Sequence, residues 1–217
     1  MSKPITLYSH ASGPNPWKVA FILQELGLPY TSKMVDFGDL KKPEFEKINI
    51  NGRVPAIEDP NTGITLWESG AIIEYLIDQY DKENKISFNT SPEKYEALQW
   101  LHFQVSGQGP YFGQAVWFSN YHPEKIPSAV TRYQNEIKRV TSVLDRALEG
   151  KQYLVGNKAS YADIAFMAWG MLVPFAMGDN MFDAAKEYPN YHAWSERIMS
   201  RPAMKKVLEE RKKANGQ

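Results

Sequence analysis

The pattern of hydrophobic and polar positions changes near residue 92 of this chain. Before that point, short apolar runs typical of strands alternate with stretches in which apolar residues recur every three or four positions. After that point only the helical spacing is found. We therefore predict a first domain of strands and helices at residues 1–82, a polar linker at residues 83–91, and an all-helical domain at residues 92–217.

The first part predicts a strand at residues 5–8, a helix, and a second strand at residues 30–36. Asn15 is expected to cap the helix and Pro16 to occupy its first turn, because asparagine is a preferred N-cap and proline suits the first helical position. Gly27 is the expected C-terminal stop. This strand–helix–strand order predicts a parallel pair with a right-handed crossover.

Residues 51–71 carry the next predicted elements, after a short helix at residues 43–49. An apolar run follows Val54 and Pro55, residues 59–63 form a turn, and a second apolar run ends at Glu68 and Ser69. An amphipathic helix then continues to about residue 80. The predicted fold class is therefore α/β plus all-α, with a mixed four-stranded sheet in the order β-α-β-α-β-β-α.

Long helical patterns dominate the second part. Apolar residues between Ile126 and Leu148 fall at steps of three or four, which predicts one long helix with a single buried face. Ser160 with Asp163 three residues later is typical of a capping box, with Asp in place of the usual Glu. Two further helices are predicted at residues 191–199 and 202–212.

Composition excludes several classes of protein. The formal net charge is zero, which gives no reason to expect nucleic acid or an anionic membrane as a partner. No run approaches 18 apolar residues and the N-terminus is unlike a signal peptide, so we expect a cytoplasmic protein. Cysteine is absent, which excludes disulfides and a cysteine nucleophile. The four histidines lie far apart, so no metal site is expected.

Several motifs together resemble soluble glutathione transferases: Val-Pro before the third strand, Glu-Ser opening the last helix of the first domain, and an S-x-A-D cap in the second domain. The sharper resemblance is to the branch of the yeast nitrogen-regulator protein and the bacterial nu-class disulfide-bond oxidoreductases, through the blocks GPNPWKVAFILQELGLPY, NGRVPAI, LWESGAIIEYL, SGQGPYFGQAVWF and AVTRYQNEIKRV. The resemblance covers the whole chain. It implies a thioredoxin-like first domain, a homodimer, and reduced or oxidised glutathione as co-substrate.

Three residues are expected to bind most of the glutathione. The helix start at Glu68 and Ser69 offers N–H groups and partial positive charge, which suit a carboxylate. The resemblance assigns both residues to the γ-glutamyl end, and the alternative is a plain helix cap. The resemblance also implies a cis bond between Val54 and Pro55, which would turn the Val54 backbone toward the cysteinyl part of the ligand.

Several residues are candidates for the glycyl carboxylate of glutathione. Arg53 could contact it or be solvated, and we favour the solvated state. Members of the family often have histidine where Leu40 stands here. Lys41 or Lys42 could take over that contact, or neither residue could.

Asn15 is the residue that the resemblance places at the ligand sulfur. A free thiol with a pKa near 8.5 is mostly protonated at neutral pH, so an amide that donates to the thiolate would raise the population of the nucleophile. The alternative is a plain N-cap, and Tyr8, Ser9 and Ser12 compete for the same position. Bacterial members also carry threonine where Gly13 stands.

Residues 107–118 combine glycines with aromatic side chains, which can line a pocket for an apolar co-substrate or can be core. The aromatic candidates are Tyr111, Phe112, Trp117 and Phe118. The resemblance implies that Arg132 lies near the active cleft, where it could meet a second glutathione; the alternative is a solvated arginine.

These features predict a glutathione transferase-like enzyme whose bound thiolate attacks a disulfide, a peroxide or a small electrophile. Glutathione-dependent disulfide reduction, peroxidase activity, or both are favoured, with weak conjugating activity and roles in detoxification and oxidative stress. Because the chain has no cysteine, disulfide exchange would run between glutathione and substrate. The alternative is a non-catalytic protein that binds glutathione or another ligand, or a regulator.

Overall fold

The computed structural model describes residues 2–216, which form two compact units. Residues 2–87 and 200–216 make the first unit, and residues 88–199 make the second. The first unit contains the elements β1 (Ile5–Ser9), α1 (Pro14–Glu25), β2 (Tyr30–Met34), α2 (Pro43–Glu46), β3 (Ala56–Asp59), β4 (Ile64–Trp67), α3 (Ser69–Tyr80) and α12 (Pro202–Ala214). The helices of the second unit are given below. A sheet with helices followed by a helical part confirms the predicted fold class.

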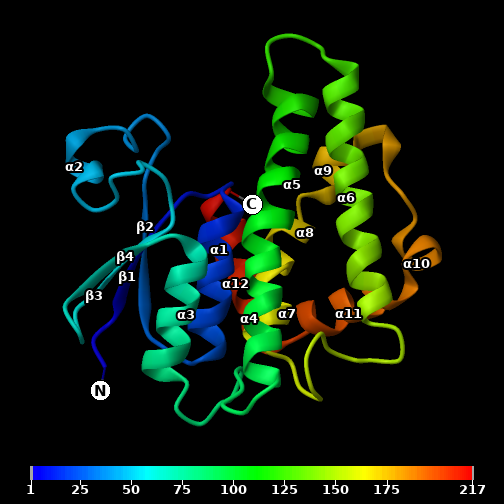
Figure 1. Cartoon of the computed structure of the whole chain (residues 1–217). Coiled ribbons are helices and arrows are strands. Elements are labelled where there is room, and N and C mark those ends of the chain that lie inside the picture. The colour runs from blue at the N-terminus through cyan, green and yellow to red at the C-terminus, as the bar shows by residue number, and fades with distance from the viewer. Residues whose placement is uncertain (1, 217) are drawn as a thin grey trace. The chain divides into compact units, whose positions relative to one another are not determined.

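The sheet has the strand order β2-β1-β3-β4 (Figure 1). Strand β1 is parallel to β2, with Ile5 opposite Tyr30, and antiparallel to β3. Strands β3 and β4 form the predicted hairpin. Asp59 closes its turn by accepting the backbone N–H of Asn61 at 2.8 Å. The parallel pair and the hairpin are both confirmed.

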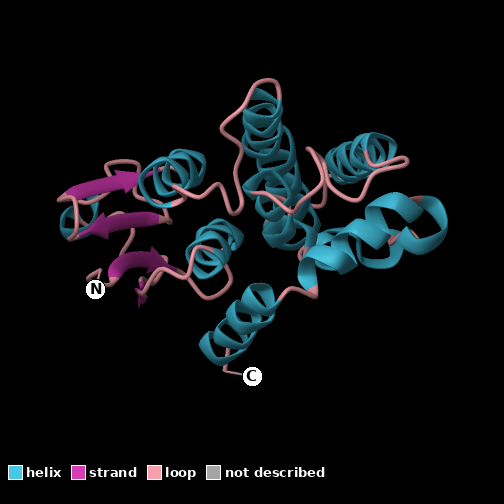
Figure 2. Cartoon of the chain, turned by 90° about the horizontal axis from the view of Figure 1, so that it is seen from below, coloured by secondary structure: helices cyan, strands magenta, loops and turns pink. Residues whose placement is uncertain are grey.

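Helices cover both faces of this sheet, with α1 and α3 on one side and α2 on the other (Figure 2). Side chains alternate across the strands, so Leu7 and Ile57 share one face and Tyr8 and Ala56 share the other. Leu7 and Ile57 are fully buried. Tyr8 and Ala56 form a second cluster with Phe45 of α2. Each face of the sheet therefore has its own core.

The start of α1 differs from the prediction. The helix begins at Pro14 with Gly13 as its N-cap, so Asn15 is the second helical residue. Proline at the first position has its φ already fixed for a helix, and its missing N–H would have no intrahelical partner. The predicted N-cap role of Asn15 is therefore wrong, although the residue still lies in the first turn. Strand β2 and helix α2 also end earlier than predicted, at Met34 and Glu46.

Helix α12 completes the first unit from the far end of the chain. It packs against α1, and its Met204 and Val207 are fully buried. The guanidinium of Arg201, the N-cap of this helix, donates to both oxygens of Glu25, at 2.6 and 2.8 Å. The domain boundaries predicted from sequence stay a prediction, but the compact unit around the sheet takes in residues 200–216.

The second unit is helical throughout its regular elements. They are α4 (Glu93–Phe103), η1 (Gln104–Gln108), α5 (Gly109–Val116), η2 (Trp117–Tyr121), α6 (Pro127–Ala147), α7 (Tyr161–Ala165), α8 (Met167–Gly170), α9 (Val173–Met177), η3 (Gly178–Asn180), α10 (Ala184–Glu187) and α11 (Pro189–Met199). Helices α5 and α6 lie side by side and antiparallel (Figure 1). Gly109 and Gly113 leave room for the ring of Trp169, which lies 3.2–3.3 Å from where their Cβ atoms would be.

The predicted capping box is confirmed at the start of α7, where Ser160 and Asp163 bond reciprocally. Among residues 2–216, no single helix is long and apolar enough to cross a membrane. One bent pair, at residues 161–170 and 173–180, passes that test by length and composition alone.

Candidate functional site

The strand register brings three segments to one end of the sheet. Tyr8 pairs with Ala56, and Ala56 pairs with Trp67 on its other side. The residues just before Ala56 therefore lie beside the end of β1, where the loop into α1 begins. The residues just after Trp67 lie beside them. Val54, Glu68 and the loop at residues 10–13 thus share one edge of the first unit.

The Val54–Pro55 peptide bond is cis, as the family resemblance implies. The loop before it is held by the buried side chain of Asn49, which donates to the Arg53 carbonyl at 2.6 Å and accepts from the Asn51 N–H at 2.9 Å. Gly52 has a φ of +57°, and a Cβ there would lie 2.7 Å from the Leu40 carbonyl oxygen. The sequence of this loop thus fixes how the backbone reaches Val54.

The residues considered for the glycyl carboxylate occupy different environments. Leu40 is buried in the core cluster of Tyr8 and Phe45, so the position that is often histidine in the family is here a packing residue. The Lys41 ammonium donates to the Asn51 carbonyl at 2.7 Å. Arg53 is exposed.

Glu68 and Ser69 form the start of α3. Glu68 is the N-cap with φ 70° and ψ 115°, and its own side chain makes no hydrogen bond that caps the helix. Such a left-handed conformation costs a non-glycine residue about 1–3 kcal/mol and is found preferentially at functional sites. Ser69 is only 6% exposed. The first turn of α3 therefore offers backbone N–H groups that no side chain of its own satisfies.

Lys18 of α1 is a charged residue that the sequence prediction did not select. It is 1% exposed, and burial lowers its pKa to about 7, while the negative charge of Glu68 opposes that shift. Helix α1 packs against α3. The available signal was a lysine inside the apolar run between Trp17 and Val19. The structure thus places a buried amine within electrostatic reach of Glu68.

The residues considered for the contact with the ligand sulfur also lie in different environments. The Tyr8 hydroxyl donates to Glu58 at 2.7 Å, and burial, helped by that hydrogen bond and charge, raises its pKa to about 12. Ser9 is 1% exposed, and within the described residues its Oγ has no hydrogen-bond partner. Ser12 is exposed, with its Oγ 3.0 Å from His10 Nδ1. Asn15 is half-buried in the first turn of α1.

In the second unit, three of the five residues considered for the co-substrate pocket surround Tyr133. The Phe118 ring stacks on it at 5.5 Å, the Tyr111 ring lies at 6.4 Å, and the Arg132 guanidinium lies 6.0 Å from its centroid. Trp117, another of the five, is 46% exposed.

Phe112 and Trp117 occupy opposite environments. Phe112 is a core residue at 2% exposure. The Trp117 ring lies 6.2 Å from that of His122, which in turn stacks on Phe118 at 4.9 Å. Trp117 is therefore linked to the other aromatic candidates through His122.

Among the described residues, no group of three or more His, Asp or Glu side chains could hold a metal ion.

Comparisons with known proteins cover nearly the whole chain. Family models of the glutathione S-transferase N-terminal and C-terminal domains match residues 3–78 and 111–211. Glutathione S-transferase 1 of Schizosaccharomyces pombe is 46% identical over 96% of this chain and 97% of its own. Protein URE2 of Candida albicans is 36% identical over 94% of this chain and 69% of its own. The structure of glutathione transferase URE2P8 from Phanerochaete chrysosporium with oxidized glutathione matches at a TM-score of 0.94 with 45% identity, covering 100% and 99%.

Proposed function

Because this chain belongs to the glutathione transferase family, we propose that it binds glutathione at the sheet edge of the first unit and uses the bound thiolate as a nucleophile. The observation that carries the proposal is the junction of Glu68 and Ser69, where a helix starts without a side-chain cap beside the Val54 backbone. A free amino acid end, with one carboxylate and one ammonium, matches a helix N-terminus flanked by an acid.

Each part of the tripeptide has a proposed partner. Ser69 and the first N–H groups of α3 bind the γ-glutamyl carboxylate, and the Glu68 carboxylate pairs with the α-ammonium. The Val54 N–H and C=O pair with the cysteinyl backbone as an added strand would. Lys41 or Arg53 is available to the glycyl carboxylate, although the ammonium of Lys41 already serves the loop.

Asn15 is proposed to donate its side-chain amide to the glutathione sulfur. Asn15 lies in the first turn of α1, beside the loop that follows β1. The first turn of a helix also favours a thiolate electrostatically. Tyr8 is the weaker candidate, because its hydroxyl already donates to Glu58.

The favoured reaction is reduction of a disulfide, with peroxide reduction and weak conjugation alongside it. The glutathione thiolate attacks one sulfur of the substrate, which forms a mixed disulfide and releases the other sulfur as a thiolate. A second glutathione thiolate attacks the mixed disulfide, which yields oxidised glutathione and the second substrate thiolate. The URE2P8 complex with oxidized glutathione supports a site that accepts both tripeptides. Arg132 is proposed to meet the second one.

The remaining proposals concern assembly and the co-substrate. The cluster of Tyr111, Phe118 and Tyr133, with Trp117 beside it, is proposed to line the apolar co-substrate pocket. We further propose that the enzyme works as a homodimer in the cytoplasm.

The test compares wild type with Asn15→Ala and Ser69→Ala. Calorimetry with glutathione should show binding to wild type and to Asn15→Ala, and at least roughly tenfold weaker binding to Ser69→Ala. Turnover is measured with 2-hydroxyethyl disulfide, cumene hydroperoxide and 1-chloro-2,4-dinitrobenzene. Asn15→Ala should lose most activity at pH 6.5 and regain part of it at pH 9, because the thiol then ionises unaided.

Two results would redirect this proposal. Unchanged turnover in Asn15→Ala would assign the sulfur contact to another residue, with Ser12 as the next candidate. Tight glutathione binding without turnover of any of the three co-substrates would instead favour the non-catalytic binding or regulatory protein.

A further inference from the structure

The loop that joins β1 to α1 is a tight turn, and the His10 side chain holds part of it. The Gly13 N–H donates to the His10 carbonyl at 3.2 Å, which closes a β-turn at residues 10–13. The Ser12 N–H donates to His10 Nδ1 at 3.2 Å, and the Ser12 Oγ lies 3.0 Å from the same nitrogen. The imidazole thus takes the place that an Asn or Asp side chain has in an Asx-turn.

These hydrogen bonds determine where the imidazole carries its proton. A backbone N–H can only donate, so Nδ1 of His10 is an acceptor and carries no proton. The Ser12 hydroxyl therefore donates to the same nitrogen. In this arrangement the His10 ring is neutral, with its proton on Nε2.

The ring of His10 also stacks on Phe37, in the loop that follows β2. The two ring centroids lie 3.7 Å apart, and the ring planes differ by 27°. The Val35 N–H donates to the Ser9 carbonyl at 2.8 Å, so the chain after β2 runs beside the chain after β1. Because Phe37 is 65% exposed, this stack lies at the surface and not in the core. Its effect is to orient the imidazole that holds the turn.

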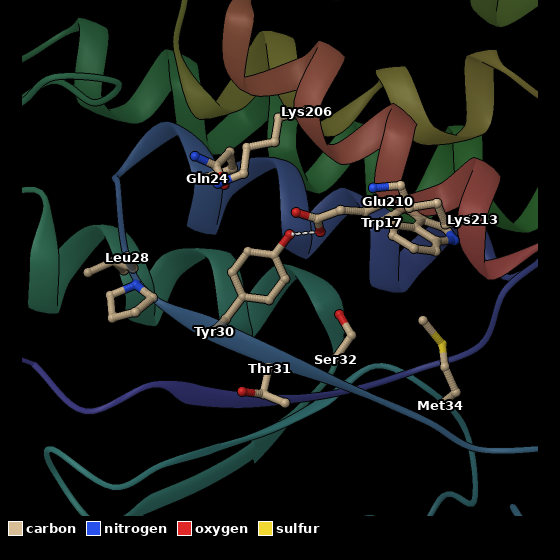
Figure 3. A pocket seen from close by; sticks show the side chains of 11 residues that line it. Trp17, Gln24, Leu28, Tyr30, Thr31, Ser32, Met34, Lys206, Glu210 and Lys213 are labelled. Carbon is tan, nitrogen blue, oxygen red and sulfur yellow. Dashed lines mark hydrogen bonds between the residues drawn. The ribbon is translucent and has the colours of Figure 1, made fainter.

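The other side of the turn is anchored through the Ala11 carbonyl. This carbonyl accepts the Trp17 indole N–H at 2.8 Å and the side-chain amide of Asn215 at 3.2 Å. Asn215 is the C-cap of α12, and the hydrogen bond from Tyr30 to Glu210, at 2.6 Å, joins that helix to β2 (Figure 3). The turn is therefore fixed on this side by α1 and α12, and on the other side by the imidazole.

The backbone between this turn and Asn15 has little freedom. Gly13 is the N-cap of α1 and is extended, with φ −73° and ψ 121°, as expected of a residue before proline. The ring of Pro14 restricts its own φ. Asn15 follows as the second helical residue, and Pro16 after it is buried. The direction in which the turn leaves His10 therefore determines where the Asn15 side chain points.

We propose that His10 is a positioning residue for the contact between Asn15 and the glutathione sulfur, an inference that rests on the function proposed above. Its imidazole, stacked on Phe37, holds the Ser12 side of the turn and thereby directs the Asn15 amide toward the thiolate. His10 itself touches neither glutathione nor the co-substrate. Loss of the imidazole should consequently change the ionisation of the bound thiol and leave the binding of the tripeptide unchanged.

The test measures the pKa of the bound glutathione thiol from its ultraviolet thiolate absorbance, together with turnover of 2-hydroxyethyl disulfide. His10→Ala should raise this pKa by about 1 and lower turnover at pH 6.5 roughly tenfold. The Kd of S-hexylglutathione, which has no thiol, should stay within about twofold of wild type, and this binding also shows that the variant is folded.

Three further variants separate the parts of the arrangement. His10→Asn should keep the wild-type thiol pKa, because its Oδ1 can accept the Ser12 N–H in an Asx-turn. Phe37→Ala should raise the thiol pKa less than His10→Ala does, because it removes the stack and leaves the acceptor. His192→Ala, which replaces a half-buried histidine of α11 in the second unit, is the control and should behave as wild type.

Asn15→Ala distinguishes failure of this inference from failure of the proposed function. If Asn15→Ala leaves the thiol pKa as in wild type, the proposed sulfur contact is wrong and the role of His10 falls with it. If Asn15→Ala raises the thiol pKa and His10→Ala does not, only the role of His10 is overturned. The double variant should have the thiol pKa of Asn15→Ala alone, because His10 acts through Asn15. A double-variant increase equal to the sum of the two single increases would show that His10 acts independently, and would overturn the inference.

Discussion

Two helix starts in this protein use serine in opposite ways. At α7, Ser160 and Asp163 bond to each other's backbone, and Asp163 is fully buried. Its carboxylate also accepts the Leu154 N–H at 2.9 Å and the Trp194 indole N–H at 2.8 Å. At α3, Ser69 follows a left-handed Glu68 whose side chain does not cap the helix.

The difference separates a structural helix start from one that is kept available. At the start of α7, side chains satisfy the backbone donors of the helix. Asp163 also links this start to Leu154 and to Trp194. The α3 start carries backbone strain and offers its donors to something else, which is the pattern expected of a binding site. Sequence motifs of similar appearance can thus have opposite roles, which only the partners of each side chain distinguish.

Asp163→Ala should have the largest effect on stability. The variant leaves four donors without their acceptor in a fully buried place, so the free energy of unfolding should fall by about 3–4 kcal/mol. Urea denaturation measures this change, and calorimetry below the transition should show unchanged glutathione affinity. Ser160→Ala, which removes only the cap hydroxyl, should cost about 1 kcal/mol. A loss of affinity in folded Asp163→Ala would mean that the two helix starts are not independent.

The charge of Lys18 interacts with Glu68 at the start of α3. Lys18→Met should remove the pH dependence that this lysine gives to the free energy of unfolding. The folded pKa of Lys18, about 7, lies below its ordinary value of 10.5, so between these values the unfolded chain binds more protons than the folded one. Wild-type stability therefore rises with pH across this window. The variant lacks this contribution. Between pH 7 and 10, the free energy of unfolding of wild type should therefore rise by a few kcal/mol relative to that of the variant.

Urea denaturation of both proteins at several pH values tests this prediction. If the difference in free energy of unfolding between the two proteins does not change with pH, Lys18 stays charged in the folded state. A weaker affinity of the folded variant for glutathione would in addition show that the ammonium helps to hold Glu68 in place.

Glu68→Gly should have the smallest effect of these variants on the free energy of unfolding, and it should raise that free energy. Glycine adopts a φ of 70° without a steric penalty, so the variant should be about 1 kcal/mol more stable than wild type. Glu68→Ala keeps the strain and serves as the control, with no such gain. Both variants should bind glutathione more weakly, because both lose the carboxylate. If Glu68→Gly is less stable than Glu68→Ala, the α3 start is not strained in the way proposed here.

Much of the fold was predictable because its signals are local. The hairpin turn, the helix from Ser69 to Tyr80 and the capping box at Ser160 each follow from residues that are adjacent or a few positions apart. The family resemblance was confirmed by the matches to both glutathione S-transferase domains. The start of α1 was missed because Asn15 lies between two prolines, either of which suits a first turn, and the structure uses Pro14.

The candidate site was predictable only in part. Glu68 and Ser69 could be selected because they stand at a helix start, but the left-handed backbone of Glu68 has no sequence signal in a non-glycine residue. Lys18 was missed because a lysine reads as a solvated residue until packing shows that it is buried. The ion pair of Arg201 and Glu25 joins residues 176 positions apart in the sequence. The spacing of apolar and polar residues cannot indicate such a distant contact.

Helix α12 belongs to the sheet unit although it lies far from the strands in sequence, and this affects folding during synthesis. The side of α1 that α12 covers is synthesised well before α12 itself. At roughly 5–20 residues per second, the 176 positions between Glu25 and Arg201 correspond to a wait of about 10–35 s. The sheet unit is therefore completed only once α12 has been made, and a nascent chain must keep that apolar side of α1 from aggregating until then.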